Sequence, residues 1–382
     1  MGLGTKLRYV LRGLLALATA ALATALPASS LDFERLAKRS WVSSNSEHFE
    51  VVSDLSERRL FDITEQLERY ATFCTLLLRT SGAKKIERSR LVVVEKSATW
   101  EYMGLEESLV AIHSRDLQPP IALLNLGAGF SGGLDRASSE RSELFKVIAL
   151  QQLRAADAGG TMPVWYQEGM ALYLSTYFEK KSKVLLGDLQ ALPESIVELI
   201  NVSGGLRDVN SEALFNTKQR PSAETETDPV GNLSQLYEFY AQSFMTLHFF
   251  QSSKEYQLRL NRYLSLLDYG DNQADALAKA FGWTFAELDR EVERYSRGPL
   301  FARAFSHRQL AQLIDAKKPG IADTIQLQEI EPESALVMYA ELMGLMSLRD
   351  IPDDEKREFI NKVGAFQGPQ DSTGSVEELE NL

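Results

Sequence analysis

The side chains best suited to chemistry lie between residues 142 and 177, where the apolar spacing predicts two consecutive helices. The first ends at the Gly-Gly pair 159–160, a helix stop signal, and the second begins near Pro163. The second helix directs Glu168 inward, where a carboxylate can ligate a metal ion or accept a proton. A hydrolytic zinc site also needs imidazoles, usually from two histidines four residues apart on one helix. The chain has four histidines (His48, His113, His248 and His307) and none are four residues apart, so the usual helical histidine pair is missing.

The segment 163–169, with the sequence P-V-W-Y-Q-E-G, resembles the second core helix of gluzincin-type zinc peptidases, in particular the peptidase MA-like family. In that family the Glu is the third zinc ligand, and a His-Glu-x-x-His motif lies on the preceding helix. The family's usual interval places that motif on residues 147–151, which read V-I-A-L-Q here. Val147 and Ile148 cannot coordinate zinc or accept a proton, and Gln151 is a poor zinc ligand. The resemblance therefore implies a degenerate member that retains Glu168 but has no catalytic residue, no bound metal and no cofactor.

Three further motifs extend the resemblance from residue 41 to residue 295. They are W-x-S-S-x-S-x-H-F-x-V-x-S-D at 41–54, F-Y-A-Q-S-F at 239–244 and A-L-A-K-A-F-G-W-T-F-A-E-L-D-R-E at 276–291. In relatives the first of these opens the domain that precedes the catalytic helices. The resemblance thus implies that His48 is a structural strand residue and not a metal ligand.

Composition sets broad limits on function. The chain has 382 residues, of which 44% are hydrophobic and 25% charged, as in ordinary globular proteins. Its formal net charge is -12 at pH 7, and no basic stripe is present, which argues against nucleic-acid binding. A single cysteine, Cys74, lies in an apolar helical pattern, which excludes an intramolecular disulfide and favours a buried, inert thiol.

The first 28 residues have the pattern of a signal peptide. Three basic residues (Lys6, Arg8 and Arg12) precede a short Ala/Leu-rich run from Leu14 to Leu26, and small residues follow. The run is too short to favour a membrane span. We therefore expect a periplasmic or secreted protein, with a membrane contact only if this segment stays uncleaved as an anchor.

The rest of the chain predicts an α+β fold, with a small mixed sheet and a zincin-like helical core followed by a mostly helical C-terminal region. Alternating residues predict a hairpin at 41–53, a 3.6-residue period predicts a long helix at 56–78, and β-branched runs predict strands. Within a peptidase MA-like domain at 32–297 we expect an α+β lobe (32–135) and a mainly helical lobe (136–297). Residues 298–366 are expected to form a helical region with helices at 306–315, 332–348 and 352–365, and residues 367–382 a disordered acidic tail.

The leading hypothesis is a pseudo-peptidase that binds a peptide, a protein or an envelope component without zinc-dependent hydrolysis. A residual groove would be formed by Trp165, Tyr166, Glu168, Tyr173, Tyr240 and His248. An inward Glu168 needs a polar or cationic partner, for which Gln151 and Arg154 are the candidates. For Trp165 and Tyr173 inward packing explains the pattern equally well, and for Tyr240 and His248 a packed aromatic stripe is the simpler interpretation.

Two hypotheses of other classes remain open. An atypical metallohydrolase would combine Glu168 with ligands from outside the motif, such as His113 or His248. A helical interaction protein would instead act through its C-terminal helices, with the preceding domain as support.

Overall fold

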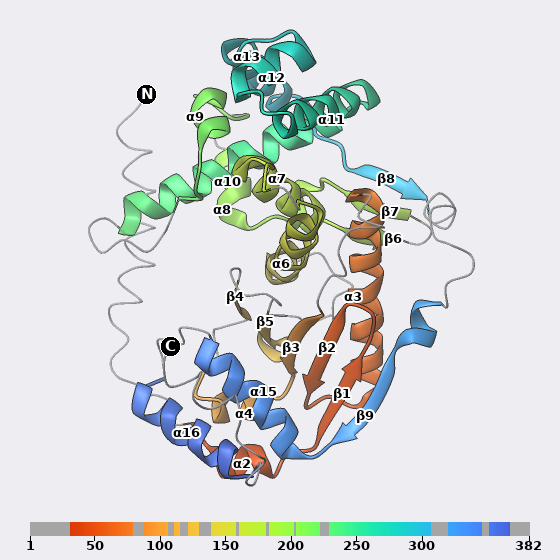
Figure 1. The fold of residues 1–382 in the computed structure, drawn as a ribbon, viewed down its shortest axis with the longest axis vertical. Helices are drawn as coiled ribbons and strands as arrows, with labels where there is room; N and C mark the ends of the chain where they lie inside the picture. Colours follow the sequence, from red (N-terminus) through yellow and green to blue (C-terminus); the bar gives the residue numbers. More distant parts are fainter. Residues whose placement is uncertain are drawn as a thin grey trace.

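The computed structural model divides into a lobe built on a mixed β-sheet and a lobe of helices, and confirms the predicted α+β class (Figure 1). The structure describes residues 31–78, 88–105, 111–114, 121–129, 139–157, 160–180, 183–201, 204–221, 229–306, 320–345 and 351–366. The segments interpreted as signal peptide and acidic tail lie outside these ranges, and those predictions remain untested. Within the described ranges, no helix combines the length and apolar character needed to cross a membrane.

The sheet has six strands in the order β4-β5-β3-β2-β1-β9. The strands are β1 (Trp41–Asn45), β2 (Phe49–Ser53), β3 (Ser89–Val94), β4 (Ala111–Ser114), β5 (Ile121–Asn125) and β9 (Gln326–Ile330). The pairs β2–β3 and β3–β5 are parallel, and the others are antiparallel. The predicted long helix, α3 (Glu57–Leu78), connects β2 to β3, because parallel neighbours need a crossover connection.

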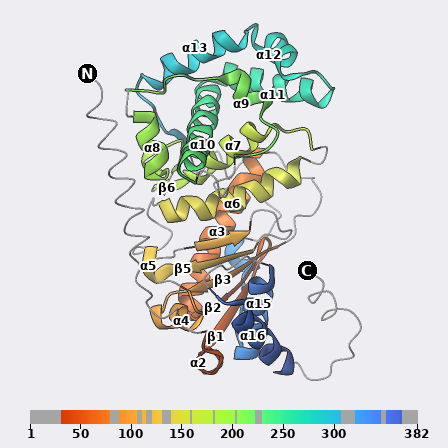
Figure 2. The same ribbon diagram turned by 90° about the vertical axis from the view of Figure 1, so that its left-hand side faces the viewer.

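The two faces of this sheet belong to two different hydrophobic cores. Because side chains alternate along a strand, Val51 and Val93 face the core shared with α3 and the helical lobe. Val52, Val92 and Leu123 face the other core, which lies under the C-terminal helices. That second layer comprises α2 (Phe33–Ala37), α4 (Ser97–Tyr102), α15 (Pro332–Leu345) and α16 (Asp353–Phe366). Figure 2 shows the sheet between its two helical covers.

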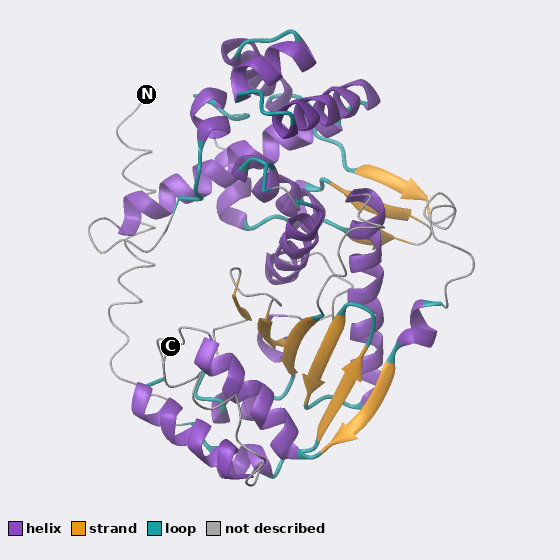
Figure 3. Ribbon diagram, viewed as in Figure 1, coloured by secondary structure: helices purple, strands orange, loops and turns teal. Residues whose placement is uncertain are grey.

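The C-terminal region is mostly helical, as expected, but it also contributes a strand to each of the two sheets, which the sequence analysis did not predict (Figure 3). Strand β8 (Arg303–Ser306) pairs with β7 (Lys183–Leu186), which also pairs with β6 (Phe178–Lys180) in a small antiparallel sheet. Strand β9 pairs with β1 along the edge of the large sheet. Ser306, the expected start of a helix, ends β8, and the rest of that expected helix lies outside the described residues. Both strands are short and partly exposed, so their strand signal is weak in the sequence.

The helical lobe contains the two predicted core helices, α6 (Ser139–Ala156) and α7 (Val164–Ser175). The other short and long helices are α5 (Leu126–Gly129), α8 (Glu194–Asn201), α9 (Ser211–Asn216), α10 (Pro229–Gln251), α11 (Lys254–Asp268), α12 (Gln273–Phe281) and α13 (Phe285–Ser296), with 3-10 turns at Leu189–Ala191 and Ile321–Thr324. Residues 284–287 have the Thr-x-x-Glu pattern of a capping box, and Thr284 and Glu287 form that box at the start of α13. Helices α7 and α10 touch at Gly169, where an added Cβ would lie 2.6 Å from the Ser243 carbonyl oxygen. Glycine at this position thus permits the close packing that holds α7 against α10.

Candidate functional site

The α6 positions aligned with the metal motif contain no metal-ligand set. Val147 and Ile148 are buried apolar side chains. The Gln151 Oε1 atom accepts a hydrogen bond from the Ser89 hydroxyl at 2.5 Å. These side chains pack and brace α6 against the sheet lobe, as their chemistry predicts.

A buried ion pair lies beside these positions and joins α6 to α7. The Lys146 ammonium is 3.9 Å from the Glu168 Oε2 atom, with side-chain exposures of 1% and 10%. The same ammonium lies 3.8 Å from the centre of the Tyr240 ring, on α10. The Tyr240 hydroxyl accepts a hydrogen bond of 3.0 Å from Arg220. Three helices therefore meet around one buried positive charge.

This arrangement gives Glu168 a cation from within the chain. A buried carboxylate is costly unless it is paired, and a buried ammonium is equally costly. The Lys146 ammonium has no hydrogen-bond acceptor in the described part of the chain, so the carboxylate and the ring face are its compensation. Lys146, which lies beside Glu168, was not among the candidate partners named from the sequence, Gln151 and Arg154. A positively charged side chain therefore lies beside this carboxylate.

His248 is held as a neutral imidazole. Its Nε2 atom lies 3.1 Å from the Gly187 carbonyl oxygen, which can only accept, so this nitrogen carries the proton. Its Nδ1 atom, 2.8 Å from the Tyr295 hydroxyl, is then the acceptor. Burial lowers the pKa of His248 below its ordinary value, although the bond to Gly187 opposes this shift. Both nitrogens are engaged, so His248 cannot ligate a metal without breaking one of these bonds.

The six expected groove residues do not form one groove. Trp165 is fully buried and stacks on Phe215 with ring centres 4.3 Å apart, and Tyr166 is also part of the hydrophobic core. Glu168 and Tyr240 belong to the buried ion-pair cluster. Tyr173 and His248 line an open pocket. Because α7 is buried on nearly every side, an aromatic residue on any of its faces packs against other parts of the protein. The spacing of the aromatic residues alone therefore cannot distinguish a core position from a position in a ligand site.

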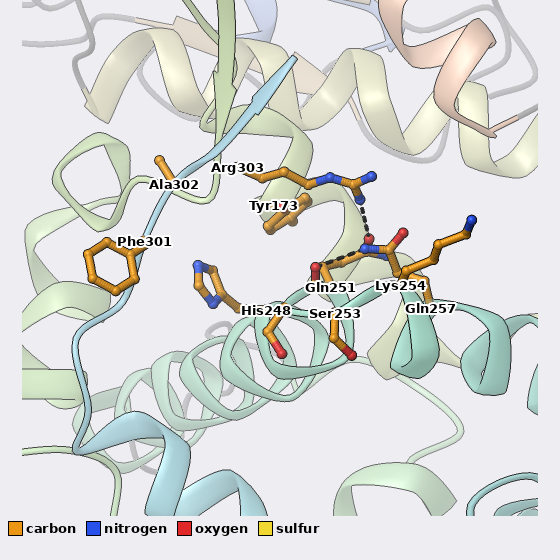
Figure 4. A pocket seen from close by; sticks show the side chains of 10 residues that line it. Tyr173, His248, Gln251, Ser253, Lys254, Gln257, Phe301, Ala302 and Arg303 are labelled. Carbon is orange, nitrogen blue, oxygen red and sulfur yellow. Dashed lines mark hydrogen bonds between the residues drawn. The ribbon is translucent and has the colours of Figure 1, made fainter.

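The pocket is a cavity of about 490 Å³ between α10, the start of α11 and the strand-forming segment at 301–303 (Figure 4). Its lining residues are Tyr173, His248, Gln251, Ser252, Ser253, Lys254, Gln257, Phe301, Ala302 and Arg303. Among the described residues, no group of three His, Cys, Asp or Glu side chains could hold a metal ion, here or elsewhere. The side chain of His113 lies outside what the structure describes.

Gly187 packs closely against two side chains that line this pocket, Tyr173 and His248. Its φ of +82° belongs to the left-handed region, and an added Cβ would lie 2.8 Å from Tyr173 Cε2 and 2.9 Å from His248 Nε2. We expect Gly187→Ala to lower the free energy of unfolding by about 2–4 kcal/mol, because backbone strain and overpacking add. Denaturant unfolding would measure this change.

Gly282→Ala provides a matched control for that substitution. Gly282 has a similar φ of +74° but no atom within 4 Å of an added Cβ, so its cost is backbone strain alone, about 1 kcal/mol. Equal losses in the two variants would mean that the Tyr173 and His248 contacts at Gly187 contribute nothing.

Two other groups singled out by the sequence have structural roles. His48 lies in the β1–β2 turn, where its Nδ1 atom is 2.6 Å from the buried Glu68 carboxylate and its backbone N–H donates to the other carboxylate oxygen. Burial raises the pKa of Glu68, but the hydrogen bonds and charge of His48 outweigh it and hold that pKa below its usual value. Cys74 is fully buried and burial raises the pKa of its thiol to about 12, in agreement with an inert role.

Sequence reasoning missed Lys146 and the two cations of the pocket, Lys254 and Arg303. A signal for Lys146 was present, since a lysine inside the apolar run L-F-K-V-I-A-L at 144–150 is unusual for a buried helix face. No comparable signal exists for Lys254 and Arg303, which are brought together by the pairing of β8 with β7.

Comparison of the chain with protein-family models, curated proteins and solved structures finds no match.

Proposed function

We propose that this protein is an exported pseudo-peptidase, a gluzincin-like scaffold that binds a peptide, a protein or an envelope component without zinc-dependent hydrolysis. The observation that carries the proposal is the contact between Lys146 and Glu168. The retained carboxylate of the family motif is paired with a buried ammonium, and that ammonium repels a divalent cation at the same carboxylate. The scaffold then keeps its packing function and loses its metal chemistry.

The alternative of an atypical metallohydrolase has less support. It requires an imidazole beside Glu168: both nitrogens of His248 already have hydrogen-bond partners, and the side chain of His113 lies outside what the structure describes. A metal at Glu168 would also have to displace the Lys146 ammonium into an apolar interior, which costs several kcal/mol.

The alternative of a helical interaction protein meets a different difficulty. Helix α15 buries Leu336, Tyr339 and Leu342 against the sheet, so its apolar residues already serve the fold. Among the C-terminal helices that the structure describes, the outward faces of α15 and α16 remain for a partner.

Metal analysis of the purified protein tests the proposal. After incubation with zinc and dialysis, elemental mass spectrometry should find far less than one zinc per chain, and the melting temperature should not change on chelation. Glu168→Ala should leave both results unchanged. Stoichiometric zinc that disappears in Glu168→Ala would instead establish a metal site at this carboxylate and exclude the pseudo-peptidase.

A further inference from the structure

The pocket between α10, α11 and residues 301–303 differs in charge from the rest of the protein. The chain carries a net charge of -12, yet no aspartate or glutamate is among the described residues that line the pocket. Its charged members are two cations, Lys254 and Arg303. Its glutamines and serines can donate hydrogen bonds to a ligand but carry no charge, and both nitrogens of His248 are already engaged within the protein.

The Arg303 guanidinium is held in place but not neutralised. The Arg303 guanidinium donates a 3.3 Å hydrogen bond to the Gln251 side-chain oxygen and lies 4.6 Å above the Phe305 ring. These contacts fix its orientation without cancelling its charge. The acid nearest in sequence to Lys254 is Glu255, which pairs with Arg259 at 2.6 Å. Neither pocket cation forms an ion pair within the part of the chain that the structure describes.

Gln251 organises the polar side of the pocket. Its backbone carbonyl accepts a hydrogen bond from the Gln257 side-chain amide at 3.0 Å, while its side-chain oxygen accepts from Arg303. The pocket therefore has a preformed polar wall, which lowers the ordering cost of binding. The first turn of α11, which begins at Lys254, also lies on this wall, and the backbone N–H groups of a helix start favour an anion.

The other side of the pocket is apolar. Phe301 is 76% exposed, which is unusual for a phenylalanine, and it lines the cavity together with Ala302 and the ring of Tyr173. In Figure 4 the charged ends of Arg303 and Lys254 lie toward one side of the pocket and the Phe301 ring toward the other. The cavity is thus matched to a ligand with an anionic end and an apolar body.

We propose that this pocket binds a carboxylate attached to an apolar group, supplied by the C-terminal residue of a peptide. Arg303 and Lys254 would receive the carboxylate, and Phe301 would pack against the side chain of that residue. An acidic side chain offers the same chemistry, and the two sources are separated below. The choice of a peptide as ligand rests on the proposed function, whereas the preference for a carboxylate rests on the pocket alone.

Isothermal titration calorimetry of the purified protein with short ligand probes tests this assignment. The probes are N-acetyl-Ala-Phe with a free carboxylate, its C-terminal amide, N-acetyl-Asp-Phe-amide and phenylacetate. The free acid should bind at least about tenfold more tightly than its amide, because a charge-assisted hydrogen bond is lost. Arg303→Gln and Lys254→Gln should each weaken binding of the free acid about tenfold, and Arg303→Lys should weaken it less.

Arg262→Gln is the matched control, because Arg262 lies on α11 but does not line the pocket and its loss changes the net charge equally. It should leave the affinity unchanged. Thermal unfolding of each variant would show that the fold is retained, which is expected since Lys254 is exposed and Arg303 is only half-buried.

The outcomes separate the pocket from the proposed function. Binding of phenylacetate that depends on Arg303, with no binding of any peptide, supports the carboxylate site and overturns the peptide-binding proposal. If a peptide binds equally well as the free acid and as the amide, and the Arg303 and Lys254 variants bind it as tightly as the unchanged protein, the proposed function stands and this inference is overturned. Equal binding of N-acetyl-Asp-Phe-amide and the free acid overturns the C-terminal source in favour of an acidic side chain.

Discussion

Replacement of Lys146 by Met is expected to lower the free energy of unfolding by about 3–5 kcal/mol, the usual cost of breaking a buried ion pair. The substitution keeps most of the side-chain volume and removes the charge, so the loss reports electrostatics and not a cavity. Glu168 would then lie in the interior without the ammonium now 3.9 Å away. Denaturant unfolding near neutral pH would measure the change.

A double-mutant cycle isolates the pair. Glu168→Gln added to Lys146→Met should recover most of the lost stability, because the buried carboxylate charge that Lys146 compensates is then removed as well. Lys279→Met is the surface control, since Lys279 and Asp271 form a 2.7 Å pair in which the lysine is half exposed; its cost should stay below about 1 kcal/mol. A coupling energy near zero between Lys146 and Glu168 would contradict both the ion pair and the proposed substitute for a metal.

The same cycle bears on function. If the ammonium replaces a metal charge, its removal should raise the affinity of Glu168 for divalent cations even though the histidines are missing. The scaffold would remain a poor zinc site, because one carboxylate provides one ligand. Under the proposed function, both the apolar residues Val147 and Ile148 and the cation at Lys146 would prevent zinc-dependent hydrolysis.

The local sequence pattern predicted the helices that bury an apolar face and the strands in which apolar and polar residues alternate regularly. The hairpin β1–β2, the helix α3 and the core helices α6 and α7 are present near their expected positions. These elements have strong periodicity or clear end signals, such as the Gly-Gly pair after α6. The fold class followed from them.

The missing parts depend on contacts between residues far apart in the chain. Strand β9 pairs with β1, and no local window contains both partners. The pocket needs β8 to pair with β7 before Arg303 can approach Gln251. Trp165 and Tyr166 were expected in a groove because their types suit ligand binding, but aromatic residues suit a core equally well.

The C-terminal segment returns to the large sheet and packs on it. The strand β9 covers the β1 edge, which would otherwise expose unpaired backbone groups. Helix α15 covers the face formed by Val52, Val92 and Leu123, and the Tyr339 hydroxyl donates a 2.6 Å hydrogen bond to the Met103 carbonyl oxygen. The segment completes the sheet lobe, although local sequence suggested a separate helical region after residue 298.

Removal of residues 299–382 is therefore expected to abolish cooperative folding of the sheet lobe. The truncation deletes the large buried side chains of the second core: Leu336, Met338, Tyr339, Leu342, Met343, Ile351 and Phe359. Each contributes about 1.5–3 kcal/mol by burial, so their sum approaches or exceeds the whole stability of about 5–15 kcal/mol that a domain usually has. Circular dichroism and hydrogen exchange on the truncated chain should show unprotected amides in β1, β2 and β3.

Point variants keep this prediction testable if the truncated chain is insoluble. Leu336→Ala should cost about 2–5 kcal/mol, whereas Lys362→Ala, on an exposed position of α16, should change stability by less than about 0.5 kcal/mol. A truncated protein that unfolds cooperatively with β1–β3 protected would show that the C-terminal segment is a separable unit. Only that result would make deletion a fair test of partner binding by the C-terminal helices; otherwise lost binding would follow from lost folding.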